Sequence, residues 1–284
     1  MKYAGLFILL ITFLLLYIIQ KKSYVFTMPH YIPRTDKQAP RVINDIPLTI
    51  YQSWGTHTVP KKMRETIHKV LKENPEFDYY LYSDEECRMY IKEHYPKEVV
   101  QAFDRLRPGA YKSDLWRYCI LYKQGGVYFD IKMYPLVPLK DLLPIQKTML
   151  VKDHIQADQH ISECIWNGLM ISAPGNEIFM ECIIDIVASC RTNFYGRNGL
   201  DITGPCLLGR MIKRYQPDKF LFYNIFSLTN VINPEDGMNE KIFYNSKVIF
   251  ISYKEYRKEQ KMFQKGLHYH EYWKTKTVYQ EWVQ

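Results

Sequence analysis

The fold is decided by one stretch, residues 125–132, which reads Gly-Gly-Val-Tyr-Phe-Asp-Ile-Lys. The two glycines predict the end of a helix, and the residues after them predict a short strand that ends at Asp130. A carboxylate at the carboxyl end of a strand in an open α/β sheet faces the crevice where such folds bind ligands. Asp130 is therefore a candidate ligand contact, and alternation along an extended strand places Lys132 on the same face.

The helix predicted before this stretch, at residues 110–123, has the clearest periodicity in the chain. Its apolar residues follow the spacing of a buried stripe. They are Leu115, Tyr118, Cys119 and Tyr122. Asp114 and Arg117 lie three residues apart and can point the same way, either toward a ligand or as a pair that orients the helix. Gly125 is placed to end the helix with a positive φ.

The remaining segments alternate between strand-like and helix-like patterns, which predicts a single α/β domain over residues 45–284. We expect strands at residues 46–54, 77–82, 148–152, 169–172 and 247–252. We expect helices at residues 61–74, at 84 to 90 or 94, and at 96–103, 178–190 and 207–215. No second-domain boundary is evident after residue 45.

The amino-terminal residues predict a membrane anchor. Residues 3–19 carry no formal charge, and as a helix they would span about 26 Å, close to the ~30 Å hydrocarbon core. We expect an uncleaved anchor at residues 1–21, because the sequence that follows has no small-x-small cleavage site. The proline-containing residues 22–44 are expected to form a stem. The positive-inside rule would leave the domain in the cytoplasm, but long domains can translocate despite such charges, so the orientation stays open.

Charge and cysteine content restrict the function class. The 284-residue chain has a net charge of +8, and half of the excess lies between Lys254 and Lys276. No nucleic-acid-binding signature accompanies this basic segment, so nucleic acid is not expected as a partner. The six cysteines include no C-x-x-C pair, which argues against a cysteine zinc site. Cys182 and Cys190 are candidates for a disulfide.

A longer pattern surrounds the opening stretch. The helix carries Ala-x-Lys-Ser-Asp-x-x-Arg-Tyr at residues 110–118, and Leu-Tyr-x-x-Gly-Gly-x-Tyr-x-Asp follows at residues 121–130. This pattern resembles glycosyltransferase family 32, the DXD sugar-binding glycosyltransferases related to the Och1-type mannosyltransferases. Four further segments resemble the family, so the likeness covers roughly residues 45–273. They are residues 46–54, with Tyr51 where the family has His, residues 166–175, residues 203–205, and a late His before Trp273.

The resemblance implies a GT-A fold, a single Rossmann-like domain with a mixed central sheet. It implies a retaining glycosyltransferase that moves a hexose from a nucleotide-diphosphate sugar to a glycan, glycolipid or glycoprotein, in a Golgi- or ER-type lumenal domain on a single-pass anchor. Asp114 would approach the donor sugar, while Asp130 and Lys132 would engage the diphosphate. The donor-binding candidates are Tyr51, Gln52, Trp54, Arg117, Gly126, Tyr128, Asn167, Asp201 and Gly204. Of these, Gly126 could equally serve only the helix end, and Asn167 and Asp201 could equally cap loops.

Lys132 departs from the family pattern. In the family, two carboxylates bind Mn²⁺ or Mg²⁺, which offsets the charge that develops on the leaving diphosphate. A protonated lysine cannot ligate a cation. Three interpretations follow: Lys132 contacts the diphosphate itself, or Asp130 holds the metal with a late histidine (His270, with His268 as the alternative), or the chain binds sugar nucleotides without catalysis.

Overall fold

The computed structural model describes residues 25–144, 147–153, 164–215, 224–233, 237–264 and 266–282. The anchor predicted at residues 1–21 lies outside these ranges. Within them, every helix is too short or too polar to cross a membrane.

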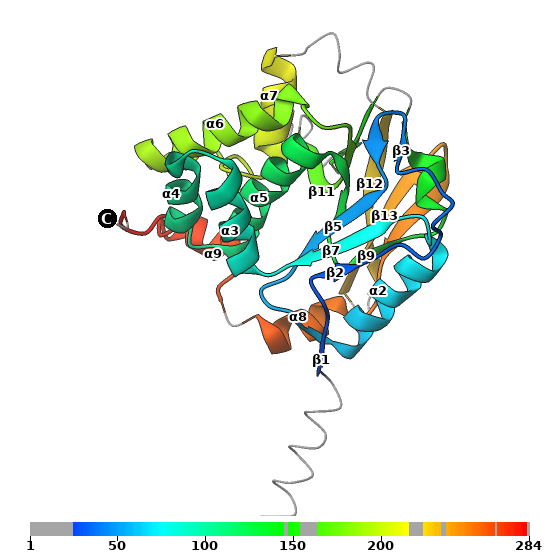
Figure 1. The fold of residues 1–284 in the computed structure, drawn as a ribbon. Coiled ribbons are helices and arrows are strands. Elements are labelled where there is room, and N and C mark those ends of the chain that lie inside the picture. Colours follow the sequence, from blue (N-terminus) through cyan, green and yellow to red (C-terminus); the bar gives the residue numbers. More distant parts are fainter. Residues whose placement is uncertain are drawn as a thin grey trace, which may run out of the picture.

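A mixed sheet of ten strands forms the centre of the domain (Figure 1). Its strands are β2 Tyr31–Ile32, β5 Thr49–Ser53, β7 Asp78–Tyr82, β8 Gly126–Phe129, β9 Met133–Pro135, β10 Thr148–Lys152, β11 Ile165–Ser172, β12 Asn224–Asn233, β13 Gly237–Tyr244 and β14 Lys247–Ser252. Their spatial order is β2-β7-β5-β8-β11-β10-β12-β13-β14-β9. A mixed sheet packed against helices fits the GT-A α/β fold that the resemblance implies.

Strand direction determines where the candidate ligand contact lies. β5 runs parallel to both of its neighbours, β7 and β8, so the carboxyl ends of these three strands share one edge of the sheet. Asp130 directly follows β8 at this edge. β11 runs antiparallel to β8, and the Asp130 backbone N–H donates to the Gly168 carbonyl oxygen at 2.9 Å. The edge therefore brings together the end of β8 and the beginning of β11.

Helices cover both faces of this sheet (Figure 1). One face packs against α3 Asp84–His94, α4 Lys97–Arg105, α5 Gly109–Gln124, α6 Glu177–Thr192 and α7 Pro205–Tyr215, and the other against α2 Lys61–Glu73. Consecutive strand residues alternate between the two cores: Tyr51 and Tyr128 face the larger set of helices, whereas Ile50 and Val127 face α2. This period of two is what a sheet buried on both sides requires.

Local sequence signals account for the ends of the helices next to the site. Ser83 and Glu86 form a reciprocal capping box at the start of α3, the helix expected from residue 84. Gly125 ends α5 with φ of 65°, and a Cβ at this position would lie 2.6 Å from the Pro174 nitrogen. The predicted glycine helix end is therefore confirmed, and close packing against Pro174 is a second reason for glycine.

Residues 25–44, expected as a stem, lie against the domain in the structure. β1 Val25–Thr27 pairs with β6 Thr58–Pro60, β2 pairs with β7 at the edge of the main sheet, and β3 Val42–Ile43 pairs with β4 Ile46–Pro47. Arg34 is 7% exposed and donates to two backbone carbonyls. Prolines are typical of linkers, but the short strands beside these prolines hydrogen-bond to strands of the domain.

Several elements were not predicted. They are the hairpin of β12 and β13, the strand β9, and the late helices α8 Tyr256–Phe263 and α9 Tyr269–Lys274. Spacing alone left a disulfide between Cys182 and Cys190 open, and in the structure both are free. They lie eight residues apart on α6, about 12 Å along the helix, which is too far for a disulfide.

Candidate functional site

Asp130 is held from three sides at the carboxyl edge of β5, β7 and β8. Its Oδ1 accepts a hydrogen bond from the Tyr128 hydroxyl at 3.0 Å and lies 3.5 Å from Arg117 Nη1. Its Oδ2 lies 3.5 Å from Lys132 Nζ. The side chain remains 25% exposed. Asp130 is thus oriented by protein groups and still accessible to a ligand.

Gly168 makes room for this carboxylate. A Cβ on Gly168 would lie 2.8 Å from Asp130 Oδ2 and 2.3 Å from the Trp166 ring. Neither contact is tolerated, so any larger residue would displace one of the two side chains. Glycine here is a steric requirement of the site.

Arg117 links α5 to the two strands beside it. Its Nη1 donates to the Asn167 carbonyl at 2.9 Å, its Nη2 donates to Ser113 Oγ at 2.9 Å, and its guanidinium lies 4.4 Å from the centre of the Tyr128 ring. Burial alone would lower the pKa of Arg117, but Tyr128, Asp114 and Asp130 outweigh it and raise the pKa. The buried guanidinium therefore stays charged and fixes the two aspartates relative to each other.

Asp114 is buried and fully hydrogen-bonded. It accepts from Asn167 Nδ2 at 3.0 Å and from Thr203 Oγ1 at 2.7 Å, and it lies 3.4 Å from Arg117 Nη2. Burial raises the pKa of this carboxyl, which Arg117 and the two hydrogen bonds only partly oppose. A Cβ on Gly204 would lie 3.5 Å from Asp114 Oδ2. Sequence reasoning named Asn167 and Gly204 as candidates but not Thr203, although its Thr-Gly-Pro segment had been matched to the family.

Lys132 has a carboxylate partner that the sequence did not indicate. Its Nζ lies 2.5 Å from Glu240 Oε2 on β13, in addition to Asp130. Glu240 in turn lies 3.7 Å from Arg257. Burial alone would lower the pKa of Lys132, but Glu240 and Asp130 outweigh it and raise the pKa, so the ammonium stays charged.

Sheet pairing brings Lys132 and Glu240 together. β14 lies between β9 and β13. The backbone N–H of Tyr253 donates to the Lys132 carbonyl at 2.9 Å, and the backbone N–H of Glu240 donates to Ser252 Oγ at 2.9 Å. Ser252, the last residue of β14, thus contacts Glu240, and the next residue, Tyr253, contacts Lys132.

The sheet edge around Asp130, named the donor crevice because α/β folds bind ligands at this edge, does not fit a two-carboxylate metal site. Three carboxylates and three cations alternate in it, so their formal charges cancel. They are Asp114, Asp130 and Glu240, and Arg117, Lys132 and Arg257. The position of a second acidic ligand is taken by the Lys132 ammonium, which repels a cation. Among the described residues, the one set of three His, Cys, Asp or Glu side chains close enough to share a metal lies elsewhere.

Several candidate donor contacts lie inside the sheet instead of at its edge. Gln52 is 1% exposed and bonds to Phe129 and Tyr79 within the sheet. Gly126 begins β8, at the strand end opposite Asp130, where a Cβ would lie 2.8 Å from the Thr49 carbonyl oxygen. The Gly126 requirement is therefore explained by strand packing.

Tyr51 and Trp54 are also buried. The Tyr51 ring stacks on Tyr80, with 5.7 Å between centroids. Trp54 follows β5 at the carboxyl edge, where its backbone N–H donates to the Tyr82 carbonyl, and its ring packs into the core beside α2. Of these candidates, Trp54 lies at the same edge of the sheet as Asp130.

The two late histidines lie at the start of α9. His268 Nδ1 accepts from the His270 backbone N–H and caps the helix, and the His270 ring stacks on Trp273 at 6.0 Å. Partial burial and the charge of Arg257 lower the pKa of His268. Burial and Asp114 raise the pKa of Tyr269, which Lys132 opposes. Tyr269, which the sequence analysis did not name, therefore lies near enough to Asp114 and Lys132 for their charges to act on it.

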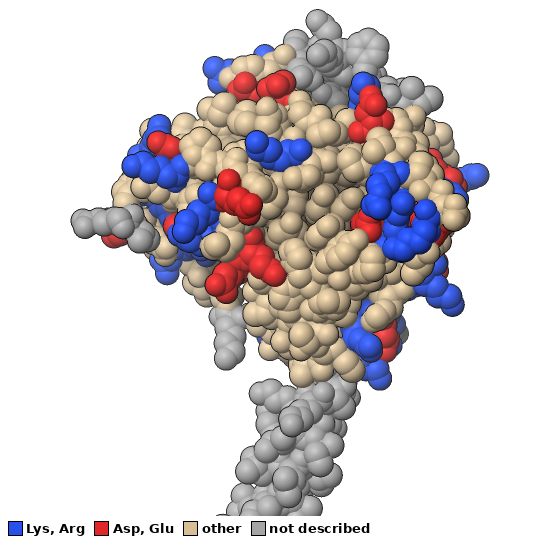
Figure 2. Space-filling model, viewed as in Figure 1, with Lys and Arg blue, Asp and Glu red and all other residues tan. Residues whose placement is uncertain are grey.

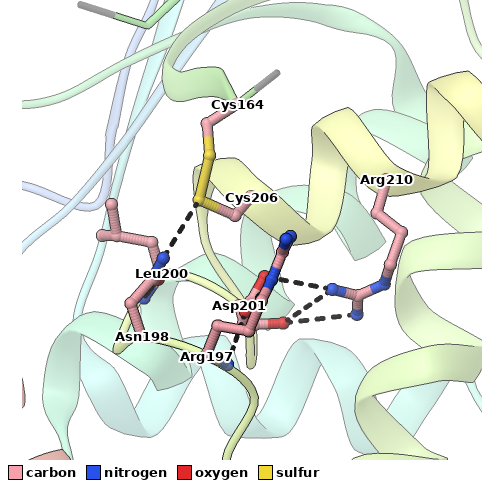
Figure 3. The surroundings of a disulfide bond; sticks show 7 residues. All are labelled: Cys164, Arg197, Asn198, Leu200, Asp201, Cys206 and Arg210. Carbon is pink, nitrogen blue, oxygen red and sulfur yellow. Dashed lines mark hydrogen bonds and ion pairs between the residues drawn. A yellow bond between two sulfur atoms is a disulfide. The ribbon is translucent and has the colours of Figure 1, made fainter. Parts of the chain in front are cut away.

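Asp201 belongs to a separate cluster beside the disulfide (Figure 3). Its Oδ2 accepts from the Arg197 backbone N–H at 2.7 Å, and its Oδ1 lies 3.3 Å from Arg210 Nη1. These contacts correspond to loop capping. The disulfide joins Cys164, just before β11, to Cys206 in α7. It therefore fixes the loop that carries Thr203 to the strand that carries Asn167.

Charged side chains on one face of the molecule form small separate groups of both signs (Figure 2). A continuous basic track does not cross this face. The charge pattern seen here is typical of an ordinary solvated surface.

Residues 60–150 match the family described as "Glycosyltransferase sugar-binding region containing DXD motif". The matched segment includes Asp114, Arg117, Asp130 and Lys132. Asn167, Thr203 and Glu240, which contact these residues in the structure, lie outside the matched segment.

Similar proteins include yeast mannosyltransferases. The chain is 35% identical over 86 residues, 30% of this chain and 24% of the relative, to inositol phosphoceramide mannosyltransferase 3 of Schizosaccharomyces pombe. It is 28% identical over 112 residues, 37% of this chain and 29% of the relative, to the initiation-specific alpha-1,6-mannosyltransferase of Candida albicans. The chain thus spans about a quarter of the length of these relatives.

A solved structure, the PaToxG glycosyltransferase, aligns with 61% of this chain and 70% of its own at a TM-score of 0.47 and 14% identity. The family match and the yeast relatives confirm the predicted resemblance: the chain is related to glycosyltransferase family 32 through its DXD-type sugar-binding region.

Proposed function

We propose that the protein is a retaining glycosyltransferase that transfers a hexose from a nucleotide-diphosphate sugar to a glycan, glycolipid or glycoprotein. The observation that supports this most directly is Asp130. It is a partly exposed carboxylate, oriented by Tyr128, Arg117 and Lys132, at the edge of the sheet where α/β folds bind ligands. It also lies in the segment that matches the DXD family.

Lys132 acts in this proposal as a fixed cation for the donor diphosphate. Charge develops on the leaving diphosphate, and a preorganised positive group stabilises it. An ammonium has three N–H donors. Glu240 and Asp130 can each take one of them, which leaves one for a phosphate oxygen. No step is assigned to a metal, because the described residues around Asp130 do not fit one.

Asp114 has a positioning role in this proposal. Its oxygens already accept from Asn167 and Thr203, so it is poorly placed to act as a nucleophile. In this proposal it holds the beginning of β11 and the loop before α7 beside the donor sugar. Transfer with retention would then proceed by attack of the acceptor on the anomeric carbon of the donor sugar, from the same face that the diphosphate leaves. The leaving diphosphate would guide this attack.

The acceptor and compartment are also proposals. The relatives named as mannosyltransferases favour mannose as the first hexose to test. The Cys164–Cys206 disulfide favours an oxidising compartment, because disulfides are rare in the cytosol. We therefore propose a lumenal domain, with residues 1–21 as the anchor.

A second candidate is a non-catalytic sugar-nucleotide-binding protein. Lys132 already forms ion pairs with both neighbouring carboxylates, Asp130 and Glu240, and this favours the second candidate. Such a protein would bind donor without turnover.

The two candidates are separated by assaying the full-length chain with a panel of nucleotide sugars, with and without Mn²⁺ and with EDTA. The enzyme proposal predicts turnover of at least one donor, insensitivity to EDTA, and loss of turnover in Asp130→Asn. Lys132→Met should lower turnover. Its matched control is Lys62→Met, which removes a surface ion pair in which Lys62 Nζ lies 2.8 Å from Glu65 Oε2. Absence of turnover with every donor, together with binding that survives Asp130→Ala, would overturn the proposal.

A further inference from the structure

Three segments distant in sequence meet at a cluster outside the donor crevice. His30 lies between β1 and β2, His57 lies between β5 and β6, and Glu86 is the third residue of α3. One ligand atom from each side chain lies within 4.8 Å of the other two. His57 Nε2 is 2.7 Å from Glu86 Oε2, and His30 Nδ1 is 3.2 Å from Glu86 Oε1.

The backbone holds the three side chains in place. The backbone N–H of Met28 donates to the His57 carbonyl at 2.9 Å, and that of Leu81 donates to the His30 carbonyl at 2.8 Å. Glu86 accepts at Oε2 from the Ser83 backbone and hydroxyl. These bonds tie the chain on either side of the cluster to the sheet and to α3, so the three ligands are preorganised.

The chemistry of the cluster suits a cation better than a hydrogen-bonded triad. Within the described part of the chain, His30 Nδ1 is buried and makes no hydrogen bond of acceptable geometry, although a carboxylate oxygen lies 3.2 Å away. Glu86 offers two carboxylate oxygens, one facing each histidine. The side chains of His30, His57 and Glu86 are 38%, 26% and 34% exposed, which leaves access for an ion and a water.

We propose that His30, His57 and Glu86 form a zinc site that fastens the amino-terminal segment of the domain to α3. Two imidazole nitrogens and a carboxylate oxygen match the ligands of zinc, with bonds of about 2.0–2.2 Å and a fourth position for water. Ligand atoms around a tetrahedral zinc lie roughly 3.3 Å apart at these bond lengths. The two nitrogen–oxygen separations, 2.7 and 3.2 Å, lie slightly below that value, so small side-chain rotations suffice. Mg²⁺ and Ca²⁺ prefer all-oxygen sites and should not compete.

The test is titration of the purified, metal-stripped full-length chain with ZnCl₂ by calorimetry and with CoCl₂ by visible absorption. We expect one equivalent to bind, four- or five-coordinate Co²⁺ bands, and a higher thermal unfolding midpoint that EDTA reverses. His57→Ala and Glu86→Gln should each weaken zinc binding at least tenfold. Glu86→Gln is the more informative variant, because a glutamine can still complete the capping box with Ser83.

The controls separate this site from other histidines and from the donor crevice. His68→Ala removes an exposed histidine of α2, and His268→Ala and Asp130→Asn alter the candidate donor site; all three should bind zinc as the unchanged chain does. Equal zinc affinity in Glu86→Gln and His68→Ala would overturn the proposal. Loss of binding in Asp130→Asn would likewise overturn it, by moving the metal to the crevice.

Discussion

The ion pair between Lys132 and Glu240 gives the most specific prediction. Replacing Lys132 by methionine keeps most of the side-chain volume but leaves Glu240 and Asp130 without their shared cation. Removing one partner of a buried ion pair typically costs about 3–5 kcal/mol. Glu240 retains Arg257 at 3.7 Å and Asp130 retains Arg117 at 3.5 Å, so we expect the lower end, about 3 kcal/mol.

The measurement is urea unfolding of the full-length chain followed by tryptophan fluorescence, with the same substitution at the exposed Lys62 as control. The double variant Lys132→Met/Glu240→Gln should recover much of the loss, since it removes both charges, and the cycle should give a coupling energy of about 2 kcal/mol. In the transfer assay, Lys132→Met should lower turnover, whereas Glu240→Gln should lower it less. A cost of Lys132→Met no larger than that of Lys62→Met would refute the reasoning.

Three further predictions test the surroundings of Asp130. Gly168→Ala should cost about 1–3 kcal/mol and reduce turnover, because its Cβ would overlap the Trp166 ring at 2.3 Å; Gly109→Ala, where a Cβ meets nothing within 4 Å, should be neutral, and similar unfolding midpoints for the two would contradict this. Asp114→Asn should cost about 1–3 kcal/mol by disrupting buried hydrogen bonds. Burial raises the Asp114 pKa, so protonation of this carboxyl stabilises the folded state below about pH 4, and this stabilisation is lost as the pH rises. The difference in the free energy of unfolding between the unchanged chain and Asp114→Asn, measured in urea, should therefore shrink with rising pH. A constant difference would argue against this reasoning. Reducing the Cys164–Cys206 disulfide, or replacing Cys206 by alanine, should cost about 2–4 kcal/mol and lower turnover; mass spectrometry showing free thiols at both Cys164 and Cys206 in the native chain would refute the bond.

Sequence periodicity predicted the elements whose burial is regular. The helix at 110–123 is observed as Gly109–Gln124, and the strands at 148–152 and 247–252 are observed at those bounds. The helix packs its apolar residues into one core, whereas the apolar residues 149–151 of β10 alternate between the two cores. Both patterns are visible in the sequence as runs of apolar residues. The hairpin of β12 and β13 was missed although Pro-Glu-Asp-Gly at residues 234–237 is a turn signal. Its strands mix polar and apolar residues without a clear period of two.

The candidate site was partly predictable for a similar reason. Asp114 and Arg117 lie on one helix, and Asp130 follows the next strand, so short-range spacing places them near one another. Thr203 reaches Asp114 only through the loop fixed by the disulfide, which depends on a contact over 42 residues. Gln52 and Gly126 were named as donor contacts from the family resemblance. The resemblance does not reveal that both lie against the backbone of neighbouring strands inside the sheet.

The strand order of the sheet explains how Lys132 can stand where the family has a second acidic residue. An isolated lysine in place of the second acidic residue would have left an unpaired cation beside Asp130. The order β13-β14-β9 instead supplies Glu240 as its partner, so the substitution is balanced by a residue more than a hundred positions away. Restoring the acidic residue alone, as Lys132→Asp, would therefore place three carboxylates together. We expect this variant to gain affinity for Mn²⁺, and Lys132→Asp/Glu240→Lys to lose that gain by restoring the pair in reverse. Manganese titration of both variants checks this, and equal affinity in the two would show that Glu240 does not govern the charge at this position.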